Sequence, residues 1–164
     1  MSALTVLAID PGNVESAYAM IDVETCRPVA FDKIPNHDLR AILCGEDAWL
    51  DADLGAVEMI RSYGMAVGAE VFETCVWIGR FIEASGCALA PIYRGDVKLH
   101  HCRSSRAKDT NVRQALVDRF APGQPNHGKG TKADPGWFHG FHSDVWAAYA
   151  LAVLVADRQM GRAA

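Results

Sequence analysis

The 164-residue sequence lacks the features of membrane-spanning and exported proteins. Its longest apolar stretch, Val145 to Ala156, is far shorter than the ~20 residues that a membrane helix needs. No cationic segment precedes the apolar run at the N-terminus, so we expect no signal peptide. Internal repeats and low-complexity segments are also missing. We expect one cytoplasmic domain over residues 1–164, because this length can bury a full hydrophobic core.

Paired cysteine motifs are missing as well. The five cysteines are scattered, odd in number and never form a CxxC pair: Cys26, Cys44, Cys75, Cys87 and Cys102. This usage favours free thiols in a reducing compartment. Cys102 follows two histidines, but no further ligands stand at a metal-site spacing, so a simple surface pair of histidines is the preferred interpretation.

The charge distribution is uneven, although the net charge is only −4. The segment from Arg94 to Lys132 contains nine of the 16 Lys and Arg residues but only three of the 20 Asp and Glu residues. Such separation favours a basic face for a polyanion and an acidic site elsewhere, over a solvated surface that happens to be basic.

The order of apolar patterns predicts an α/β fold, with helices on the faces of a mixed sheet. Expected strands are Leu4–Ile9, Ser16–Val23, Arg27–Ile34, Leu54–Ile60 and Ala88–Ile92. Expected helices are Ala66–Glu83, Gly95–His101, Thr110–Phe120 and Asp144 to about Arg158. The first of these helices carries a stripe of Val67, Val71, Thr74, Cys75, Ile78 and Ile82. The segment Leu39–Asp51 is ambiguous between a short helix and a loop, and 122–140 is predicted to be a mobile loop.

Three carboxylates stand where apolar segments predict a buried position. Asp10 ends the first strand before Pro11-Gly12, Glu58 lies inside an apolar run, and Asp144 begins an alanine-rich helix on its inner face. Each also has an ordinary interpretation: a turn residue, a solvent-facing strand residue, or a first-turn residue that favours the helix dipole. Three inward acids without an adjacent Lys or Arg need a cation, and oxygen ligands select Mg²⁺ or Mn²⁺.

These segments resemble RuvC-type Holliday junction resolvases, which are ribonuclease H-like nucleases. Ala8-Ile9-Asp10-Pro11-Gly12, Val57-Glu58 and His142-Ser143-Asp144 are similar to the family's acidic motifs, in the same order. Asp96-Val97-Lys98 and the segment Arg106–Asp109 resemble its DNA-contacting region. The resemblance implies a ribonuclease H-like mixed five-stranded sheet flanked by helices. The spacing is closer to phage-type members, which implies the cytoplasm of a bacterial or phage-infected cell.

The activity that the resemblance implies is that of a crossover junction endodeoxyribonuclease. Two Mg²⁺ or Mn²⁺ ions would act at each site, with Asp10 bridging both and Glu58 and Asp144 each holding one. The family places a further ligand three residues before the helix carboxylate, where this sequence has Phe141. We therefore expect His142 to be the fourth group, as ligand or general base, with His139 and Asp134 as alternatives. Each of these three could also be a loop residue without a role.

The basic segment would contact DNA phosphates. Lys98 and Lys108 match the family's DNA-contacting lysines, and Arg103, Arg106 and Arg113 are candidates by proximity. Trp137 and Phe138 could stack on an unpaired base, or pack under the loop.

The expected partner is branched DNA, in particular a four-way junction. We expect no association with a membrane. A junction has two-fold symmetry, so we expect a homodimer, with the interface on the apolar-rich helix Ala66–Glu83 unless both faces of that helix are buried. Rival interpretations are a nuclease of this fold for other branched DNA or RNA–DNA hybrids, and a non-catalytic DNA-binding module. The Asp-Pro-Gly turn also resembles actin-like ATPases, but 164 residues are too few for their two domains.

Overall fold

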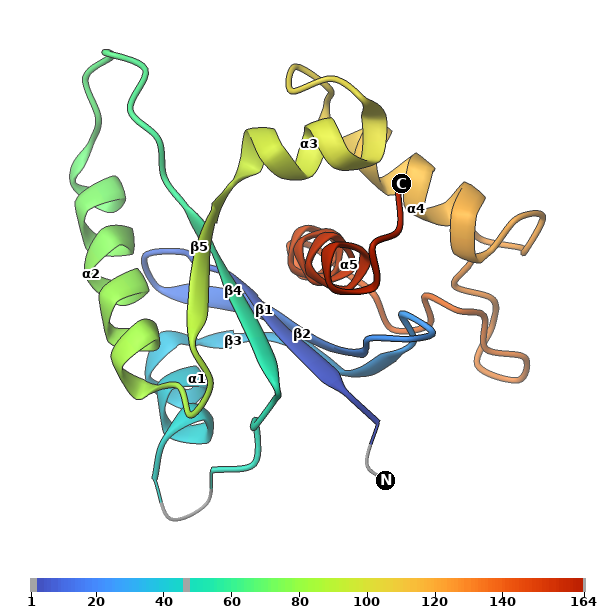
Figure 1. Ribbon diagram of the computed structural model, residues 1–164, viewed down its shortest axis with the longest axis horizontal. Coiled ribbons are helices and arrows are strands. Elements are labelled where there is room, and N and C mark those ends of the chain that lie inside the picture. Colours follow the sequence, from blue (N-terminus) through green and yellow to red (C-terminus); the bar gives the residue numbers. More distant parts are fainter. Residues whose placement is uncertain (1–2, 46–47, 164) are drawn as a thin grey trace.

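A computed structural model of the chain describes residues 3–45 and 48–163. Its centre is a five-stranded sheet in the order β3-β2-β1-β4-β5 (Figure 1). The strands are β1 Thr5–Asp10, β2 Glu15–Asp22, β3 Pro28–Pro35, β4 Leu54–Met59 and β5 Leu89–Tyr93. The first three form an antiparallel meander, while β4 and β5 run parallel to β1. The predicted mixed five-stranded sheet is therefore confirmed.

Side chains on β1 alternate between two hydrophobic clusters, because successive residues of a strand point to opposite faces. Val6 and Ala8 belong to the cluster that also contains the long C-terminal helix. Leu7 and Ile9 belong to the cluster on the other face of the sheet. The position of Asp10 in this alternation directs its side chain to the face of the C-terminal helix, so the sheet carries a carboxylate toward that helix.

Helices cover both faces of the sheet. They are α1 Asn36–Leu43, α2 Ala69–Ala84, α3 Arg94–Cys102, α4 Asp109–Phe120 and α5 Val145–Met160. Figure 1 shows α1 and α2 on one face and α5 on the other, with α3 and α4 beyond α5. The ambiguous segment 39–51 thus begins inside α1, and its residues 46–47 lie outside the described residues.

The predicted stripe on α2 is wrong in part. The buried residues are Thr74, Trp77, Ile78 and Phe81, whereas Cys75 and Ile82 are exposed. Apolar residues occur all around this helix, so periodicity alone does not select the face that packs. The helix also begins at Ala69 and not at Ala66, after Gly68, whose backbone is extended. The outer face of α2 consequently remains apolar and open.

The C-terminal end of α5 is fixed by a buried carboxylate. Asp157 is fully buried and accepts hydrogen bonds from Arg119 of α4 at 2.7 and 2.8 Å and from Arg162 at 3.0 Å. His100 of α3 lies 2.8 Å from the same carboxylate. Because a buried carboxylate is costly without cations, these contacts join α3, α4 and α5 into one packed unit.

The loop between α4 and α5 packs on the core. Phe138 and Phe141 are buried beside Trp146 and Tyr149, with ring centroids 4.7–5.6 Å apart. Trp137 stacks on Phe120 at 5.3 Å and donates a hydrogen bond to the Tyr149 hydroxyl. Phe138 is therefore a packing residue; the alternative in which it stacks on a base is wrong, because its ring is fully covered.

Within residues 3–45 and 48–163, no helix is long and apolar enough to cross a membrane.

Candidate active site

Strand register brings charged residues from three strands, β1, β3 and β4, into one row. Ile9 of β1 pairs with Val57 of β4, so Asp10 and Glu58 are the next neighbours along these parallel strands. On the other side, Asp10 pairs with Ala17 of β2, and Ala17 pairs with Lys33 of β3. Paired positions share a face of the sheet. Two acids and a lysine therefore point to the α5 face at the same edge.

The turn after β1 holds Asp10 in place. The backbone N–H of Gly12 donates to the Ser16 hydroxyl at 3.0 Å, and that hydroxyl donates to the Asn36 side chain at 2.6 Å. The Asn36 amide returns a hydrogen bond to the Gly12 carbonyl at 2.9 Å. A Cβ at Gly12 would collide with the carbonyl oxygen of Glu15, so the close turn requires glycine. Ser16 and Asn36 are supporting residues that the sequence analysis missed.

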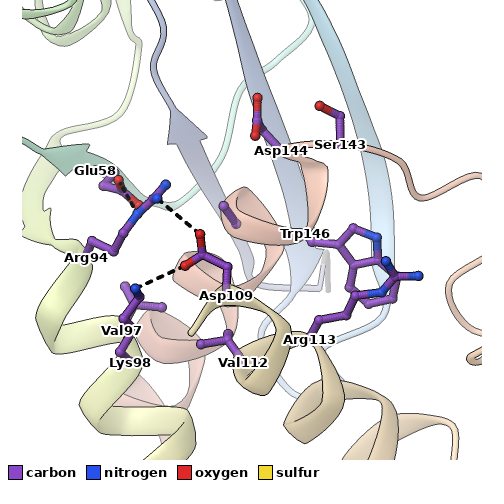
Figure 2. Close-up of a pocket in the computed structure, with 12 residues that line it drawn as sticks. Glu58, Arg94, Val97, Lys98, Asp109, Val112, Arg113, Ser143, Asp144 and Trp146 are labelled. Carbon is purple, nitrogen blue, oxygen red and sulfur yellow. Dashed lines mark hydrogen bonds and ion pairs between the residues drawn. The ribbon is translucent and has the colours of Figure 1, made fainter. Parts of the chain in front are cut away.

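The two sheet carboxylates are bridged by an arginine. Arg94, the first residue of α3, donates from Nε to Glu58 Oε1 at 2.9 Å, and its Nη2 lies 3.7 Å from Asp10 Oδ1. Its Nη1 reaches Asp109 Oδ2 at 3.5 Å (Figure 2). No Lys or Arg is adjacent to these acids in the sequence, but the fold brings the Arg94 guanidinium to both Asp10 and Glu58. Arg94 is far from both acids in sequence, and only the pairing of β4 with β5 brings it to them.

The third predicted acid, Asp144, lies directly before α5 and is more exposed than predicted. Its side chain is 51 % exposed and forms an ion pair with Lys33 Nζ at 2.6 Å. Ser143 before it has a positive φ of 45° and lies 3.4 Å from the same ammonium. The helix dipole favours a carboxylate at this end of α5. Because the small Ala17 separates Lys33 from Asp10, the lysine can extend across the sheet toward Asp144.

Burial and neighbouring charges raise the pKa values of the two sheet acids, Asp10 and Glu58. The pKa of Asp10 is raised well above its usual range, first by burial and then by the negative charge of Glu58, with a smaller contribution from Asp144. Burial also raises the pKa of Glu58, while the charge of Arg94 opposes this shift. The site thus concentrates negative charge in a poorly solvated place, where a bound cation is favourable.

The carboxylate oxygens of Asp10, Glu58 and Asp144 are chemically suited to bind a hard divalent ion. Carboxylate oxygens are the ligands that Mg²⁺ and Mn²⁺ prefer, and repulsion around Asp10 would be relieved by such an ion. The distances differ from those of a preformed centre: within the described part of the chain, no group of three His, Cys, Asp or Glu residues is close enough to hold a metal. Arg94 and Lys33 take up the carboxylates instead, so metal binding requires these two side chains to move.

The candidates for a fourth group lie apart from these acids. His142 is exposed, and its Nε2 lies 3.5 Å from Asp32 Oδ1 on β3. His139 contacts the Lys129 carbonyl through Nδ1 at 3.3 Å. Asp134 is exposed in the turn that is closed by the bridge between Gly130 and Pro135. Among the described residues, no recorded hydrogen bond or ion pair joins these three to Asp10, Glu58 or Asp144.

The predicted DNA contacts fall into two groups. Lys98 and Arg113 line the same cleft as Glu58 and Asp144 (Figure 2). Lys98 Nζ lies 3.2 Å from Asp109 Oδ1, and the Arg113 guanidinium stands 4.5 Å above the Trp146 ring. The second group, which we name the basic turn, is Arg103, Arg106 and Lys108; all three are exposed between α3 and α4. Positive charge therefore flanks the acidic row.

Comparison with known proteins identifies the fold. No family model matches the chain, and none of the curated proteins compared with it is similar enough to match. Two solved structures from Thermus thermophilus do match: RuvC alone, and RuvC in complex with a Holliday junction substrate. Each has a TM-score of 0.64 and 16 % sequence identity, and each comparison covers 98 % of both chains. The chain therefore has a RuvC-like, ribonuclease H-like α/β fold over nearly its whole length.

Proposed function

We propose that this chain is a metal-dependent, structure-selective endonuclease that resolves four-way DNA junctions by paired nicks. The observation that carries the proposal is the register that sets Asp10 beside Glu58 at the sheet edge, on the face of α5 and Asp144. Its fold neighbours support a nuclease, and one of them is bound to a Holliday junction substrate.

Asp10, Glu58 and Asp144 would hold Mg²⁺ or Mn²⁺, with two ions per site. Bound metal would supply an activated water and stabilise the leaving oxygen of the scissile phosphate. The protein's own part is to fix Asp10 and Glu58 on adjacent strands and to bring Asp144 over them from α5. His142 is proposed as the fourth group; it precedes Asp144 by two residues and is free to turn from the exposed Asp32.

The DNA would lie along the basic turn and enter the cleft beside Lys98 and Arg113. Contacts from these side chains to phosphates position a duplex without reading its sequence. Such contacts suit an enzyme that recognises the shape of a branch.

A homodimer would present two such sites to the two strands that must be cut. We place its interface on the outer face of α2, where Phe72 and Val76 are exposed. Tyr63 and Met65 are exposed in the segment that leads into this helix. Exposed apolar side chains grouped in this way are typical of protein interfaces, and a two-fold axis places the same face on both subunits.

The test is incubation of the purified protein with a synthetic four-way junction, with Mg²⁺, with Mn²⁺ and with a chelator. Flaps and RNA–DNA hybrids of the same sequence serve as comparison substrates. We expect metal-dependent nicks at symmetric positions in two opposing strands of the junction. Faster cutting of flaps or hybrids would show that one of these, and not the four-way junction, is the preferred substrate. Binding without cutting in any metal would indicate a non-catalytic DNA-binding module, in which Arg94 and Lys33 neutralise the acids permanently.

A further inference from the structure

We propose that Arg94 is the resident counter-ion of the acidic site, which an incoming metal ion must displace, and that Asp109 is the carboxylate that receives it. The inference rests on the proposed metal site at Asp10 and Glu58. It adds a positioning role for two residues that the proposed mechanism leaves unused.

The backbone fixes the starting position of Arg94. Glu58 of β4 pairs with Ile92 of β5, and Ile92 belongs to the cluster on the α5 face. Arg94 follows Ile92 by two residues, at the start of α3. Because residues two apart on a strand lie on the same face, Arg94 is placed on the α5 face as well. Its guanidinium is consequently delivered to the acids by strand pairing, and not by a flexible loop.

The acids need a cation when no metal is bound. The side chains of Asp10 and Glu58 are only 9 % and 16 % exposed, so leaving them both charged and unpaired would be unfavourable. Arg94 contacts both through different nitrogens, which the planar fork of a guanidinium allows and a single ammonium does not. A divalent ion that bound these two carboxylates would compete for the same oxygens.

A second position for the guanidinium already exists. Asp109 begins α4, is 70 % exposed, and offers Oδ2 to Arg94 and Oδ1 to Lys98. Figure 2 shows the Asp109 carboxylate between the Arg94 and Lys98 side chains. Arg94 is itself 44 % exposed, so its side chain has room to turn toward solvent. It can release Glu58 and Asp10 while keeping, and shortening, its 3.5 Å contact with Asp109.

Two opposite effects on metal affinity follow. Removing the guanidinium removes the competitor, so Arg94→Met should bind Mn²⁺ more tightly than the wild-type chain. Removing the charge of Asp109 leaves the guanidinium with Glu58 and Asp10 alone, so Asp109→Asn should bind Mn²⁺ more weakly. Metal binding at Asp10 and Glu58 is thus coupled to the position of the Arg94 guanidinium. Coupling of this kind typically changes binding affinity by about 5- to 150-fold.

The experiment is calorimetric titration of the full-length protein with Mn²⁺, without DNA, using the wild type, R94M, D109N and D10N. Arg61→Met is the matched control, because the Arg61 guanidinium stacks 4.1 Å above the Tyr93 ring next to Arg94. We expect R94M to bind at least about fivefold more tightly, D109N to bind severalfold more weakly, and R61M to equal the wild type. D10N should lose Mn²⁺ binding. R94K, which keeps a charge but not the fork, should fall between R94M and the wild type, and it serves if R94M does not fold.

The outcomes separate the two proposals. If the wild type binds Mn²⁺ and D10N does not, but R94M, R94K and D109N bind like the wild type, the role of Arg94 is overturned and the proposed metal site stands. If R61M tightens binding as much as R94M, the effect is a general loss of positive charge, and the inference is again overturned. If the wild type and D10N both fail to bind, or bind equally, the metal site and the inference fall together.

Discussion

At the scale of single residues, the site depends on a few carboxylates whose charge is costly to keep. Asp10 is nearly buried, and Glu58, one strand away, adds to the negative charge around it. No core residue gains stability from such an arrangement, because like charges in a poorly solvated place repel. The arrangement is understandable if the acids serve a ligand, and this gives the residue-level prediction.

Asp10→Asn should reduce junction cleavage by at least ~100-fold while leaving junction affinity within about twofold. Even loss of a partner that only orients a metal ligand costs about 10–100-fold, and Asp10 would be a ligand itself. Cleavage in Mg²⁺ and binding in chelator are the two measurements. The control is Glu24→Gln, an exposed acid at the β2–β3 turn. A D10N protein that cuts like the control would contradict the assignment of the active site.

The residues that sequence reasoning missed share a physical cause. Arg94 and Lys33 contact acids that are 36 and 111 positions away. Their placement depends on which strands pair and in which register, and neither can be deduced from the local pattern around these residues. The low exposure of the Asp10 and Glu58 side chains could be predicted, because each stands at the end of, or inside, an apolar run. The exposure of Asp144 could not be predicted, because the direction of its side chain depends on the turn at Ser143.

At the scale of elements, the strands and helices follow the apolar pattern closely. The apolar runs of β1 and α5 predict these two buried elements correctly. Helix α2 was harder, because its apolar residues surround the whole helix. The loop 122–140 was also harder: its glycines and prolines indicate a loop, but the packing of Trp137 on Phe120 of α4 and of Phe138 on Trp146 of α5 depends on rings outside the loop.

The junction of α3, α4 and α5 should lose stability when its buried carboxylate is removed. Asp157→Asn leaves Arg119 and Arg162 without their partner, at a cost of about 3 kcal/mol in the free energy of unfolding. Chemical denaturation at pH 7 measures this. The control, Asp118→Asn on the surface of α4, should change stability by less than about 0.5 kcal/mol. Equal effects of the two substitutions would show that the Asp157 contacts do not stabilise the fold.

His101 of α3 should make stability depend on pH. Burial lowers the pKa of His101 to about 4, although its hydrogen bond to the Ala150 carbonyl opposes this shift. The unfolded chain therefore takes up a proton near pH 6.5 while the folded chain does not, so stability is full above pH 6.5 and falls as the pH drops toward 4. The slope is at most roughly 1.4 kcal/mol per pH unit, because one proton is involved.

The substitution His101→Gln keeps a donor for the Ala150 carbonyl but does not titrate. We expect the variant to have a shallower loss of stability than the wild type between pH 6.5 and 5, measured by denaturant unfolding at each pH. The Asp157 carboxylate does not interfere in this window: although burial raises its pKa, hydrogen bonds from Arg119 and His100 hold the pKa below its usual range. Parallel curves for the two proteins would contradict the assignment.

At the scale of the whole molecule, the sequence resemblance and the fold agree over the full sheet. The segment between α3 and α4, which carries the basic turn, lies on the α5 side of the sheet, whereas α2 lies on the other side (Figure 1). The cleft is lined by residues of α3, α4 and α5 together with Glu58, and the exposed apolar residues of α2 include Phe72 and Val76. This arrangement leaves one side of the sheet for the proposed DNA binding and the other for the proposed second subunit. Both surfaces lead to tests that do not depend on catalysis.

The outer face of α2 should control the oligomeric state. Val76→Glu places a charge in the proposed interface twice per dimer, and should weaken dimerisation by at least ~10-fold without unfolding the subunit. Val29→Glu on β3 is the matched control, because the two valines are similarly exposed, at 54 % and 56 %. Analytical ultracentrifugation gives the dissociation constants. A V76E protein that dimerises like V29E would exclude this face as the interface.

The basic turn should set the salt dependence of DNA binding. Arg106→Gln and Lys108→Gln should each weaken junction binding and reduce the slope of log affinity against log salt by about 0.9, since each removes one phosphate contact. Arg40→Gln, an exposed arginine on α1 beyond the opposite sheet face, is the control. The measurement is a binding titration in chelator at several salt concentrations. Slopes equal to that of the control would remove the basic turn from the DNA-binding surface.

The most direct test of the central claim uses a supercoiled plasmid that extrudes a cruciform, incubated with the protein in Mg²⁺ and in chelator. The cruciform base is a four-way junction, and two nicks made within one bound complex convert the plasmid to a linear product. We predict linear DNA from the wild type in Mg²⁺, none in chelator, and none from D10N. Cutting that is unaffected by chelator, or equal cutting of the same plasmid without the cruciform, would contradict the account.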